Sequence, residues 1–224
     1  MKAINVVVLG ASGAVGSAAI ETLSNLEGVQ KITALVRRPL EQPVSPKLNV
    51  QIVNVTEPQS YVPYLRGHDA AICIFGAGQP SKVSHEEFKA IDYDAVLAFA
   101  KACHTAGVQH FELLGSIMAD PAARSFYLKS KGRLREAIAG LNFERFSCFQ
   151  PSMILTPTNR YGPSQAALLA VWPVISALLV GPASLYRGIR VQELGAAMAN
   201  NLFAEGRGVE VLHWRDFKSL LHQH

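Results

Sequence analysis

Three side chains near the middle of this 224-residue chain have the types and the spacing needed to move a proton. Tyr127 and Lys131 are four residues apart, so on a helix they would lie on one face, one turn from each other. Ser116 comes shortly before them, at the end of an apolar run that predicts a strand. The ammonium of Lys131 would stabilise the phenolate of Tyr127, and Ser116 would hydrogen-bond the reacting oxygen. The three residues therefore predict proton transfer to a carbonyl oxygen or from an alcohol.

Tyr-x-x-x-Lys is a weak motif when it stands alone, because both residue types are common on helices. Lys131, like Lys129, could simply be a solvated charge on a surface helix. The position of the motif, on a predicted helix directly after a strand that ends in Ser116, favours a catalytic role. The hydride for such a reaction would come from a nicotinamide cofactor.

A glycine-rich turn near the start of the chain is the candidate site for that cofactor. Residues 4–9 predict a strand, residues 17–26 predict a helix, and the turn between them has GxxGxxG spacing. Gly10 would permit the tight turn, Gly13 would let a pyrophosphate approach the backbone, and Gly16 would let the helix pack on the strand. The helix N-terminus would offer N–H groups to phosphate, whereas a turn that binds nothing is the alternative interpretation. The predicted phosphate-binding residues are Gly10, Ala11, Ser12, Gly13, Ala14, Val15 and Gly16.

Two arginines follow the second predicted strand, residues 31–36. An acidic residue at such a strand end would hydrogen-bond the ribose of NAD, and no acid stands there. Arg37 and Arg38 instead match the 2′-phosphate of NADP in charge and in hydrogen-bonding geometry. Two solvated loop arginines are the alternative, but beside the glycine-rich turn the pair predicts NADP, used as NADPH, in preference to NAD.

Strands and helices alternate along most of the remaining chain. Further strands are predicted at residues 48–55, 70–75, 109–115, 142–149 and 209–214, and helices at residues 84–106 and within 121–141. The alternation predicts an α/β fold, a Rossmann-type doubly wound parallel sheet with strand order 3-2-1-4-5-6 that the last strand could extend. The carboxyl edge of that sheet would bring the glycine-rich turn and the proton-transfer residues together.

The pattern changes after residue 155. An apolar segment, residues 165–180, is interrupted by Pro173, and a short strand (residues 187–191) and a helix (residues 193–203) follow it. The segment after residue 155 is too short for an independent domain. We therefore expect one NAD(P)-binding domain, residues 1–224, with a core of residues 1–155. Residues 156–224 would lie over the carboxyl edge as a lid and supply the substrate pocket.

Composition narrows the possible partners. Hydrophobic residues make up 49% of the chain and the net charge is +4 without a basic run, so nothing argues for nucleic acid. Three cysteines among apolar neighbours predict buried free thiols, and no His/Cys set has the spacing of metal ligands. The apolar segment is shorter than the ~20 residues that span a bilayer. We expect a cytoplasmic protein without a membrane span.

These motifs together resemble the short-chain dehydrogenase/reductase superfamily, and most closely its atypical branch that includes the Tat-interacting-protein type oxidoreductases. The resemblance covers residues 4–155 well and the remainder poorly. The stretches that carry it are Gly10–Gly13, Arg37–Arg38, Gly67–Asp69, His110–Ser116, Phe126–Gly132, Phe143–Phe146 and Gln150–Ser152.

The resemblance implies NADP(H) binding and a reductase site made of Ser116, Tyr127 and Lys131. The glycines after the fourth strand could let the backbone pass close to the cofactor, or they could equally form an ordinary turn. Beyond the glycine-rich turn and the arginines, the residues expected to contact the cofactor are Asn54, Val55, Gly76, Ala77, Gly78, Leu114, Gly115, Tyr127, Lys131, Pro151, Ser152, Met153 and Ile154.

The chain departs from the superfamily pattern at two positions. Gly115 stands where a second serine is usual. Asp92 lies near the position at which many members carry an asparagine that helps to relay protons, and a carboxylate there could act differently.

An NADPH-dependent reductase of a small carbonyl compound is the first functional hypothesis. An NADP(H)-binding redox sensor or protein-interaction module with little turnover is the alternative. A sugar-nucleotide epimerase or dehydratase ranks last, because the region after residue 155 leaves little room for such a substrate. The apolar segment around Trp172 could form a pocket wall or the contact of a homodimer.

Overall fold

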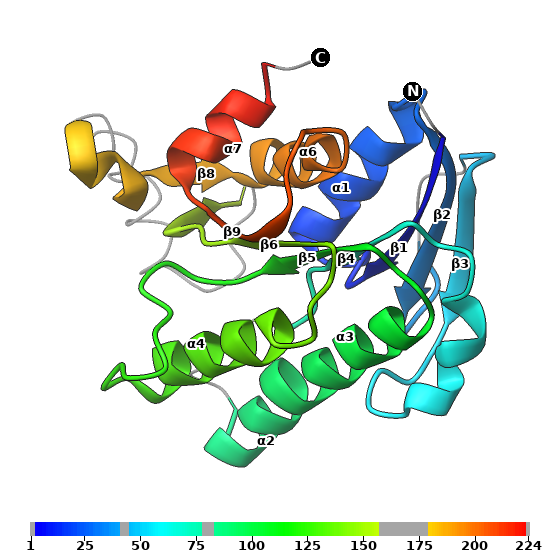
Figure 1. Cartoon of the computed structure of the whole chain (residues 1–224), viewed down its shortest axis with the longest axis horizontal. Helices are drawn as coiled ribbons and strands as arrows, with labels where there is room; N and C mark the ends of the chain where they lie inside the picture. The colour runs from blue at the N-terminus through cyan, green and yellow to red at the C-terminus, as the bar shows by residue number, and fades with distance from the viewer. Residues whose placement is uncertain (1–2, 41–44, 78–82, 157–178, 223–224) are drawn as a thin grey trace.

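The computed structural model describes residues 3–40, 45–77, 83–156 and 179–222, and these contain one parallel sheet of seven strands (Figure 1). The strand order is β3-β2-β1-β4-β5-β6-β9. The predicted Rossmann-type order is therefore confirmed, and β9 is the strand that extends it. The strands are β1 (Ile4–Leu9), β2 (Val29–Val36), β3 (Leu48–Ile52), β4 (Ala70–Cys73), β5 (His110–Leu114), β6 (Arg145–Phe149) and β9 (Gly208–Leu212).

Helices cover both faces of the sheet (Figure 1). On one face lie α1 (Ala14–Asn25), α6 (Val191–Asn201) and α7 (Trp214–Leu220), and α1 packs directly on α6. On the other face lie α2 (His85–Lys89), α3 (Val96–Thr105) and α4 (Phe126–Ala139). β1 and β4 are apolar and buried between the two layers, as expected for strands covered on both faces. The burial of these central strands gives the fold its two hydrophobic cores.

The helix predicted at residues 84–106 is present, but it is not uniform. Ser84 and Glu87 form the capping box at its start, and Gly107, with a φ of +88°, follows its end. Between α2 and α3 the turns widen into a π-helical segment, Ala90–Ala95. Such widened turns are frequent at functional sites.

Several predicted strands are shorter in the structure than in the sequence pattern, the third and the sixth most of all. The sixth begins at Arg145 and not at Asn142, because Asn142 adopts a φ of +58° in the turn after α4. The third ends at Ile52, where the chain turns into two short 3-10 helices, Pro58–Ser60 and Val62–Tyr64.

Residues beyond position 155 contribute to the body of the fold. β9 pairs with β6, and α6 and α7 complete one helical layer. A second, two-stranded sheet joins β7 (Met153–Leu155) to β8 (Gly188–Arg190), next to a 3-10 helix, Gly181–Tyr186. Neither β7 nor α7 was predicted, because both are short. The predicted apolar helix around Pro173 lies outside the described residues.

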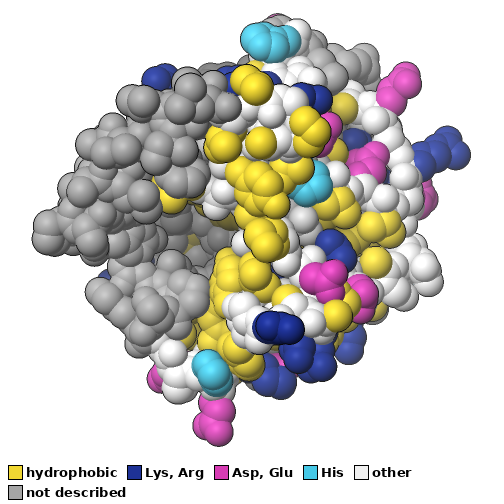
Figure 2. Space-filling model, turned by 90° about the vertical axis from the view of Figure 1, so that its left-hand side faces the viewer, with side chains coloured by type: hydrophobic (Ala, Val, Ile, Leu, Met, Phe, Trp, Pro, Cys, Tyr) yellow, Lys and Arg dark blue, Asp and Glu magenta, His cyan; other side chains and the backbone are white. Residues whose placement is uncertain are grey.

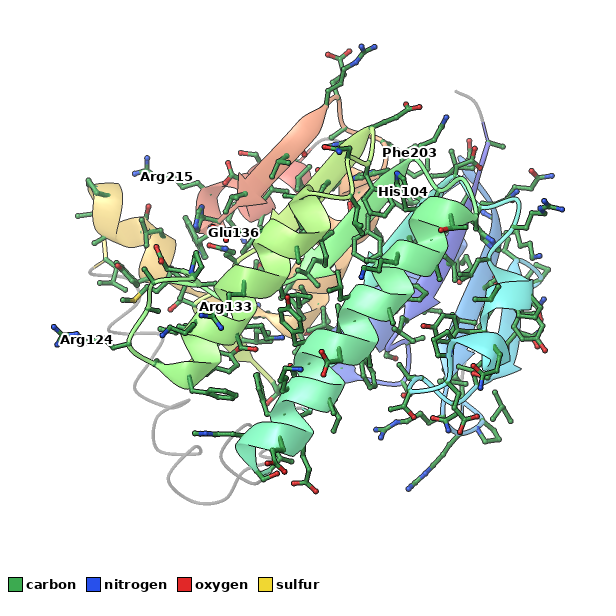
Figure 3. All side chains as sticks on the ribbon, turned by 60° about the horizontal axis from the view of Figure 1, so that its bottom comes forward. His104, Arg124, Arg133, Glu136, Phe203 and Arg215 are labelled. Atoms are coloured by element: carbon green, nitrogen blue, oxygen red, sulfur yellow. The ribbon has the colours of Figure 1, made fainter. Side chains whose placement is uncertain are left out.

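The two edges of the sheet are easily told apart. Figure 3 shows Arg124 and Arg215 at the end of the molecule where α4 begins, and His104 and Phe203 at the other end. The first end is the carboxyl edge of the parallel strands. Cys73, Cys103 and Cys148 are buried free thiols, as predicted. Within the described parts of the chain, no helix is long and apolar enough to cross a membrane.

Candidate active site

The glycine-rich turn joins β1 to α1 at the carboxyl edge. Gly10 has a φ of +93°, and a Cβ there would lie 2.7 Å from the carbonyl carbon of Ile74, just after β4. A Cβ on Gly16 would collide with the carbonyl oxygen of Gly10. Among the described residues, a Cβ on Gly13 would meet only that same oxygen, at 3.3 Å. The fold itself therefore requires Gly10 and Gly16, whereas Gly13 leaves space beside the backbone.

The first turn of α1 has unused backbone donors. Gly13 is the N-cap residue, and its carbonyl oxygen accepts the N–H of Ser17 at 2.8 Å. The N–H groups of residues 14–16 have no acceptor among the described residues, and this turn carries no acidic side chain. Free N–H groups at the positive end of a helix dipole fit a phosphate.

A crevice continues from this turn to the two arginines. Arg37 and Arg38 are exposed and line a cavity of about 540 Å³ together with Ala11, Ser12 and Ser17. The guanidinium of Arg37 also lies 5.9 Å from the centre of the Phe75 ring. In the described part of the chain, neither arginine has an ion-pair partner, so both are available to an anionic ligand.

The turn after β3 contains two of the expected cofactor contacts, Asn54 and Val55, and the two side chains point to different places. Val55 lines a smaller cavity, of about 180 Å³, together with Gly13 and Arg37. The side chain of Asn54 turns back on its own loop, where Oδ1 accepts the hydroxyl of Thr56 at 2.8 Å and Nδ2 donates to Glu57 at 2.7 Å. Val55 therefore faces the crevice, whereas Asn54 shapes the turn.

The loop after β5 is held against α4, the helix that carries Tyr127 and Lys131. Gly132 packs against this loop so closely that a Cβ would collide with the carbonyl carbon of Asp120. The N–H of Asp120 also donates to the carbonyl oxygen of Leu128 at 3.2 Å. This loop begins with Ser116, and α4 carries Tyr127 and Lys131. The contact between the loop and α4 therefore holds all three predicted catalytic residues at the carboxyl edge.

The three predicted catalytic side chains lie in different environments. Lys131 is 7% exposed. Tyr127 is half-buried, and its ring contacts that of Phe88 edge-on, with the ring centres 5.6 Å apart. Ser116 is half-buried, and its hydroxyl donates to the carbonyl oxygen of Ile117 at 3.3 Å.

The ion-pair partner of Lys131 is Asp92, which the π-helical segment supplies. Lys131 Nζ donates to Asp92 Oδ1 at 2.8 Å, and Asp92 Oδ2 accepts the N–H of Ala77 at 2.7 Å. A Cβ on Gly76 would lie 2.7 Å from Asp92 Oδ1. The carboxylate is therefore wedged between the loop that follows β4 and helix α4.

This pairing keeps Lys131 charged although it is buried. Desolvation by itself lowers the pKa of Lys131, but the Asp92 carboxylate, with contributions from Tyr127 and Cys73, more than reverses the effect. The pKa of Lys131 therefore lies above its ordinary value. At neutral pH the site contains an ammonium that is already paired.

The remaining predicted cofactor contacts lie around the same edge. The N–H of Gly115 donates to Phe149 at 2.7 Å, and a Cβ on Gly115 would lie 2.9 Å from Cys148 Sγ, which explains why no serine stands there. The carbonyl oxygen of Pro151 accepts the N–H of Ile117 at 3.1 Å, so residues 151–154 run beside the loop that begins at Ser116. Leu114 ends β5, and Gly78 lies outside the described residues.

Sequence reasoning did not find the contact between Asp92 and Lys131. The two residues are 39 positions apart, and the helical pattern around Asp92 marked its helix as core. The signal available in the sequence was an acidic residue on a helix that also carries an apolar stripe. In the structure the side chain of Asp92 is 5% exposed.

Figure 2 shows one face of the molecule, with hydrophobic side chains along its middle and Lys and Arg side chains grouped below them. Free N–H groups, a glycine-rich turn and two exposed arginines fit a phosphorylated dinucleotide. Fold and site together define a dinucleotide-binding protein of the Rossmann type.

Comparison with known families agrees with this class. A family model described as NAD(P)H-binding matches residues 10–140, which contain the glycine-rich turn and the helix with Tyr127 and Lys131. The chain belongs to this NAD(P)H-binding family.

Curated relatives confirm the resemblance inferred from the motifs. Protein HTATIP2 of Rattus norvegicus is 30% identical over 227 residues, which cover 99% of this chain and 90% of the relative. Protein FMP52, named as mitochondrial, of Meyerozyma guilliermondii is 32% identical over 155 residues, which cover 66% of this chain and 64% of the relative.

Solved structures show the same fold at low identity. MoeE5 in complex with UDP-glucuronic acid and NAD has a TM-score of 0.73 at 19% identity, covering 93% of this chain and 75% of that chain. The oxidoreductase ylbE of Lactococcus lactis has a TM-score of 0.70 at 18% identity, covering 99% and 98%. Family and fold together identify an oxidoreductase-like protein that binds a nicotinamide dinucleotide.

Proposed function

We propose that this protein is an NADPH-dependent reductase of small carbonyl compounds. One observation carries the proposal: the free N–H groups of α1 and the helix with Tyr127 and Lys131 meet at the carboxyl edge of one parallel sheet. Ligands of open α/β sheets bind outside that edge. A phosphate-binding turn and a proton donor at the same edge of a sheet are the two parts that carbonyl reduction requires.

The proposed cofactor contacts follow from charge and free donors. The N–H groups of residues 14–16 would hold the pyrophosphate, and Val55 would lie against the adenine. Arg37 and Arg38 would hold the 2′-phosphate, since each guanidinium offers a fork of donors and lacks an ion-pair partner within the described residues. The bound nicotinamide supplies the hydride.

The residues of α4 and of the loop after β5 would handle the proton. Tyr127 donates its phenolic proton to the carbonyl oxygen as the hydride reaches the carbonyl carbon, and an alcohol results. Ser116 donates a hydrogen bond to the same oxygen after its hydroxyl turns away from Ile117. Lys131 stays an ammonium close to Tyr127 and favours the phenolate that the reaction leaves behind.

Replacement of Tyr127 by phenylalanine tests the assignment. NADPH oxidation is followed by absorbance with a panel of aldehydes and ketones. Tyr127→Phe should lower kcat by at least about 100-fold, because a positioned general acid contributes that much, while the affinity for NADPH should stay unchanged. Tyr93→Phe, on the neighbouring π-helical segment, is the matched control and should retain activity. Equal turnover in Tyr127→Phe and the parent protein would refute the catalytic assignment.

A regulatory NADP(H)-binding protein with little turnover is the second candidate. It is favoured by the hydroxyl of Ser116, which donates to Ile117 at 3.3 Å, and by the pairing of Lys131 with Asp92. Tight NADPH binding measured by calorimetry, without NADPH oxidation on any member of the panel, would support this candidate over the reductase.

We further propose that the whole chain forms one domain whose region beyond residue 155 supplies the substrate side. Support comes from β8, which pairs with β7, because Pro151, just before β7, accepts the N–H of Ile117 in the loop after β5. A cytoplasmic location and a homodimer remain predictions. Cell fractionation tests the location, particularly because the FMP52 relatives are named mitochondrial.

A further inference from the structure

Asp92 is not part of the proton transfer proposed above, yet it is the acid against which Lys131 is packed. The titratable groups that face Lys131 are Asp92 from the π-helical segment, Tyr127 from α4, Cys73 from β4 and Cys148 from β6. Burial raises the pKa of the Cys73 thiol to about 12 and that of Cys148 to about 11, so both thiols are neutral at neutral pH. In the described part of the chain, Asp92 is therefore the anion that faces this ammonium.

The position of Asp92 is tightly determined. Its Oδ1 lies 2.8 Å from Lys131 Nζ, and its Oδ2 lies 2.7 Å from the backbone nitrogen of Ala77. A Cβ on Gly76 would lie 2.7 Å from Oδ1, so the carboxylate occupies space that only a glycine leaves open. One side chain thus joins the turn beside the cofactor crevice to the lysine beside the proton donor.

The pair has a consequence for Tyr127. An isolated buried ammonium one helical turn away would strongly favour the phenolate. With Asp92 at hydrogen-bond distance, the ammonium and the carboxylate form a pair of zero net charge, and the field at Tyr127 is weaker. The paired ammonium therefore favours the phenolate of Tyr127 less than an unpaired one would.

We propose that Asp92 is a positioning residue: it holds Lys131 in an ion pair, and its negative charge offsets that of Lys131 at Tyr127, the residue that donates a proton to a carbonyl oxygen. This inference rests on the proposed reductase function. It adds that loss of the Asp92 charge makes the phenolate of Tyr127 easier to form, and the phenolate is the form that accepts a proton when an alcohol is oxidised.

An absorbance titration of the full-length protein tests the inference without any substrate. Tyrosinate absorbs in the near ultraviolet, and the difference between each protein and its Tyr127→Phe counterpart reports Tyr127 alone. Asp92→Asn keeps the shape of the side chain and removes its charge. The pH at which the Tyr127 phenolate forms should fall by about one unit in this variant, because the neighbouring cation is no longer offset.

Two further variants separate charge from structure. Asp94→Asn removes an acid two residues away whose carboxylate pairs with Lys89 on the surface, at 2.8 Å, and it should leave the titration unchanged. Asp92→Asn combined with Lys131→Met removes both charges and should return the titration to that of the parent protein. This double variant also contains no unpaired buried cation, so it provides the test if Asp92→Asn alone does not fold.

The outcomes distinguish this inference from the function on which it rests. An unchanged titration in Asp92→Asn, or a double variant that titrates far from the parent protein, would overturn the role of Asp92 even if carbonyl compounds are reduced. If the titration shifts as expected but no carbonyl compound is reduced, the role of Asp92 is supported and the proposed reductase function is contradicted.

Discussion

Two ion pairs with buried cations lie at opposite edges of the same sheet. They differ in how many of the cation's N–H donors have a hydrogen-bond acceptor in the protein. At the carboxyl edge, Lys131 pairs with Asp92 at 2.8 Å. At the amino edge, Arg145 pairs with Glu210 at 3.0 Å. Both cations are less than one tenth exposed. Burial and charge alone therefore do not distinguish a functional pair from a structural one.

The neighbours of Arg145 show a structural role. Its Nη1 donates to the carbonyl oxygens of Asn201 at 3.0 Å and Ala204 at 2.6 Å, and its Nη2 donates to Asn201 Oδ1 at 2.9 Å. The side chain thus caps the end of α6 and joins β6 to β9. Lys131 has one hydrogen-bond partner among the described residues, which leaves donors of its ammonium free.

Cavity size would point to the wrong edge. The cavity beside Arg145 measures about 570 Å³, whereas those beside the glycine-rich turn measure about 540 and 180 Å³. At the amino edge the polar groups bond to each other: Ser147 donates to Glu210 at 2.8 Å and contacts His110 Nε2 at 2.9 Å. Free donors, more than volume, identify the candidate site.

The largest expected effect is the loss of the amino-edge pair. Arg145→Met should lower the free energy of unfolding by about 3–5 kcal/mol, because it leaves Glu210 without its ion-pair partner and the carbonyl oxygens of Asn201 and Ala204 without this donor. Urea denaturation measures this change. The folded fraction should bind NADPH as the parent protein does, and a weakened affinity in folded protein would contradict the assignment of this edge to structure.

The next largest effect is a loss of cofactor affinity at the carboxyl edge, with no change in the free energy of unfolding. Arg38→Ala should weaken NADPH binding by about 10- to 100-fold, since a hydrogen bond to a charged group contributes about 1.5–3 kcal/mol, and should leave NADH binding unchanged. Calorimetry measures both affinities. Arg207→Ala, an exposed cation of the amino edge, is the control for long-range charge. Equal losses in the two variants would show that Arg38 makes no specific contact.

Glu112 makes the stability of the amino edge depend on pH. Burial raises its pKa well above the ordinary 4.5, so the folded protein retains a proton that the unfolded chain releases, and stability falls as pH rises. Burial lowers the pKa of His110 from 6.5 to about 3, which has the opposite sign and cancels this slope between pH 4.5 and 6.5. Above pH 6.5 we expect the free energy of unfolding to fall as pH rises towards the raised pKa of Glu112, by up to about 1.4 kcal/mol per pH unit.

Glu112→Gln should abolish that slope, because an amide mimics the protonated acid at every pH. Urea denaturation at several pH values compares the variant with the parent protein. Glu205→Gln, at an exposed acid, should keep the slope. A slope that survives in Glu112→Gln would assign it to another group.

The smallest effect compares two glycines of one turn. Gly13→Ala should lower NADPH affinity by about fivefold, roughly 1 kcal/mol, and change the free energy of unfolding by less than that, because its Cβ meets one oxygen at 3.3 Å. Gly16→Ala should instead destabilise the fold, because its Cβ collides with the backbone of Gly10. The reverse order of effects would show that Gly13 does not face the ligand.

Much of this molecule could be predicted because its information is local. The buried runs of β1 and β4, the capping box at Ser84 and the stop at Gly107 are short-range features, and chirality leaves few ways to connect them. The glycine-rich turn and the four-residue spacing of Tyr127 and Lys131 are local as well. The fold and the dinucleotide class therefore followed from the sequence.

The tertiary structure alone decided which groups meet across long separations. The contacts of Asp92 with Lys131 and of Arg145 with Glu210 join residues 39 and 65 positions apart. No periodicity encodes such contacts, because they depend on how helices and strands pack once the sheet has formed. The same reason explains why β7 was missed: a three-residue strand has too little pattern of its own and exists only because β8 pairs with it.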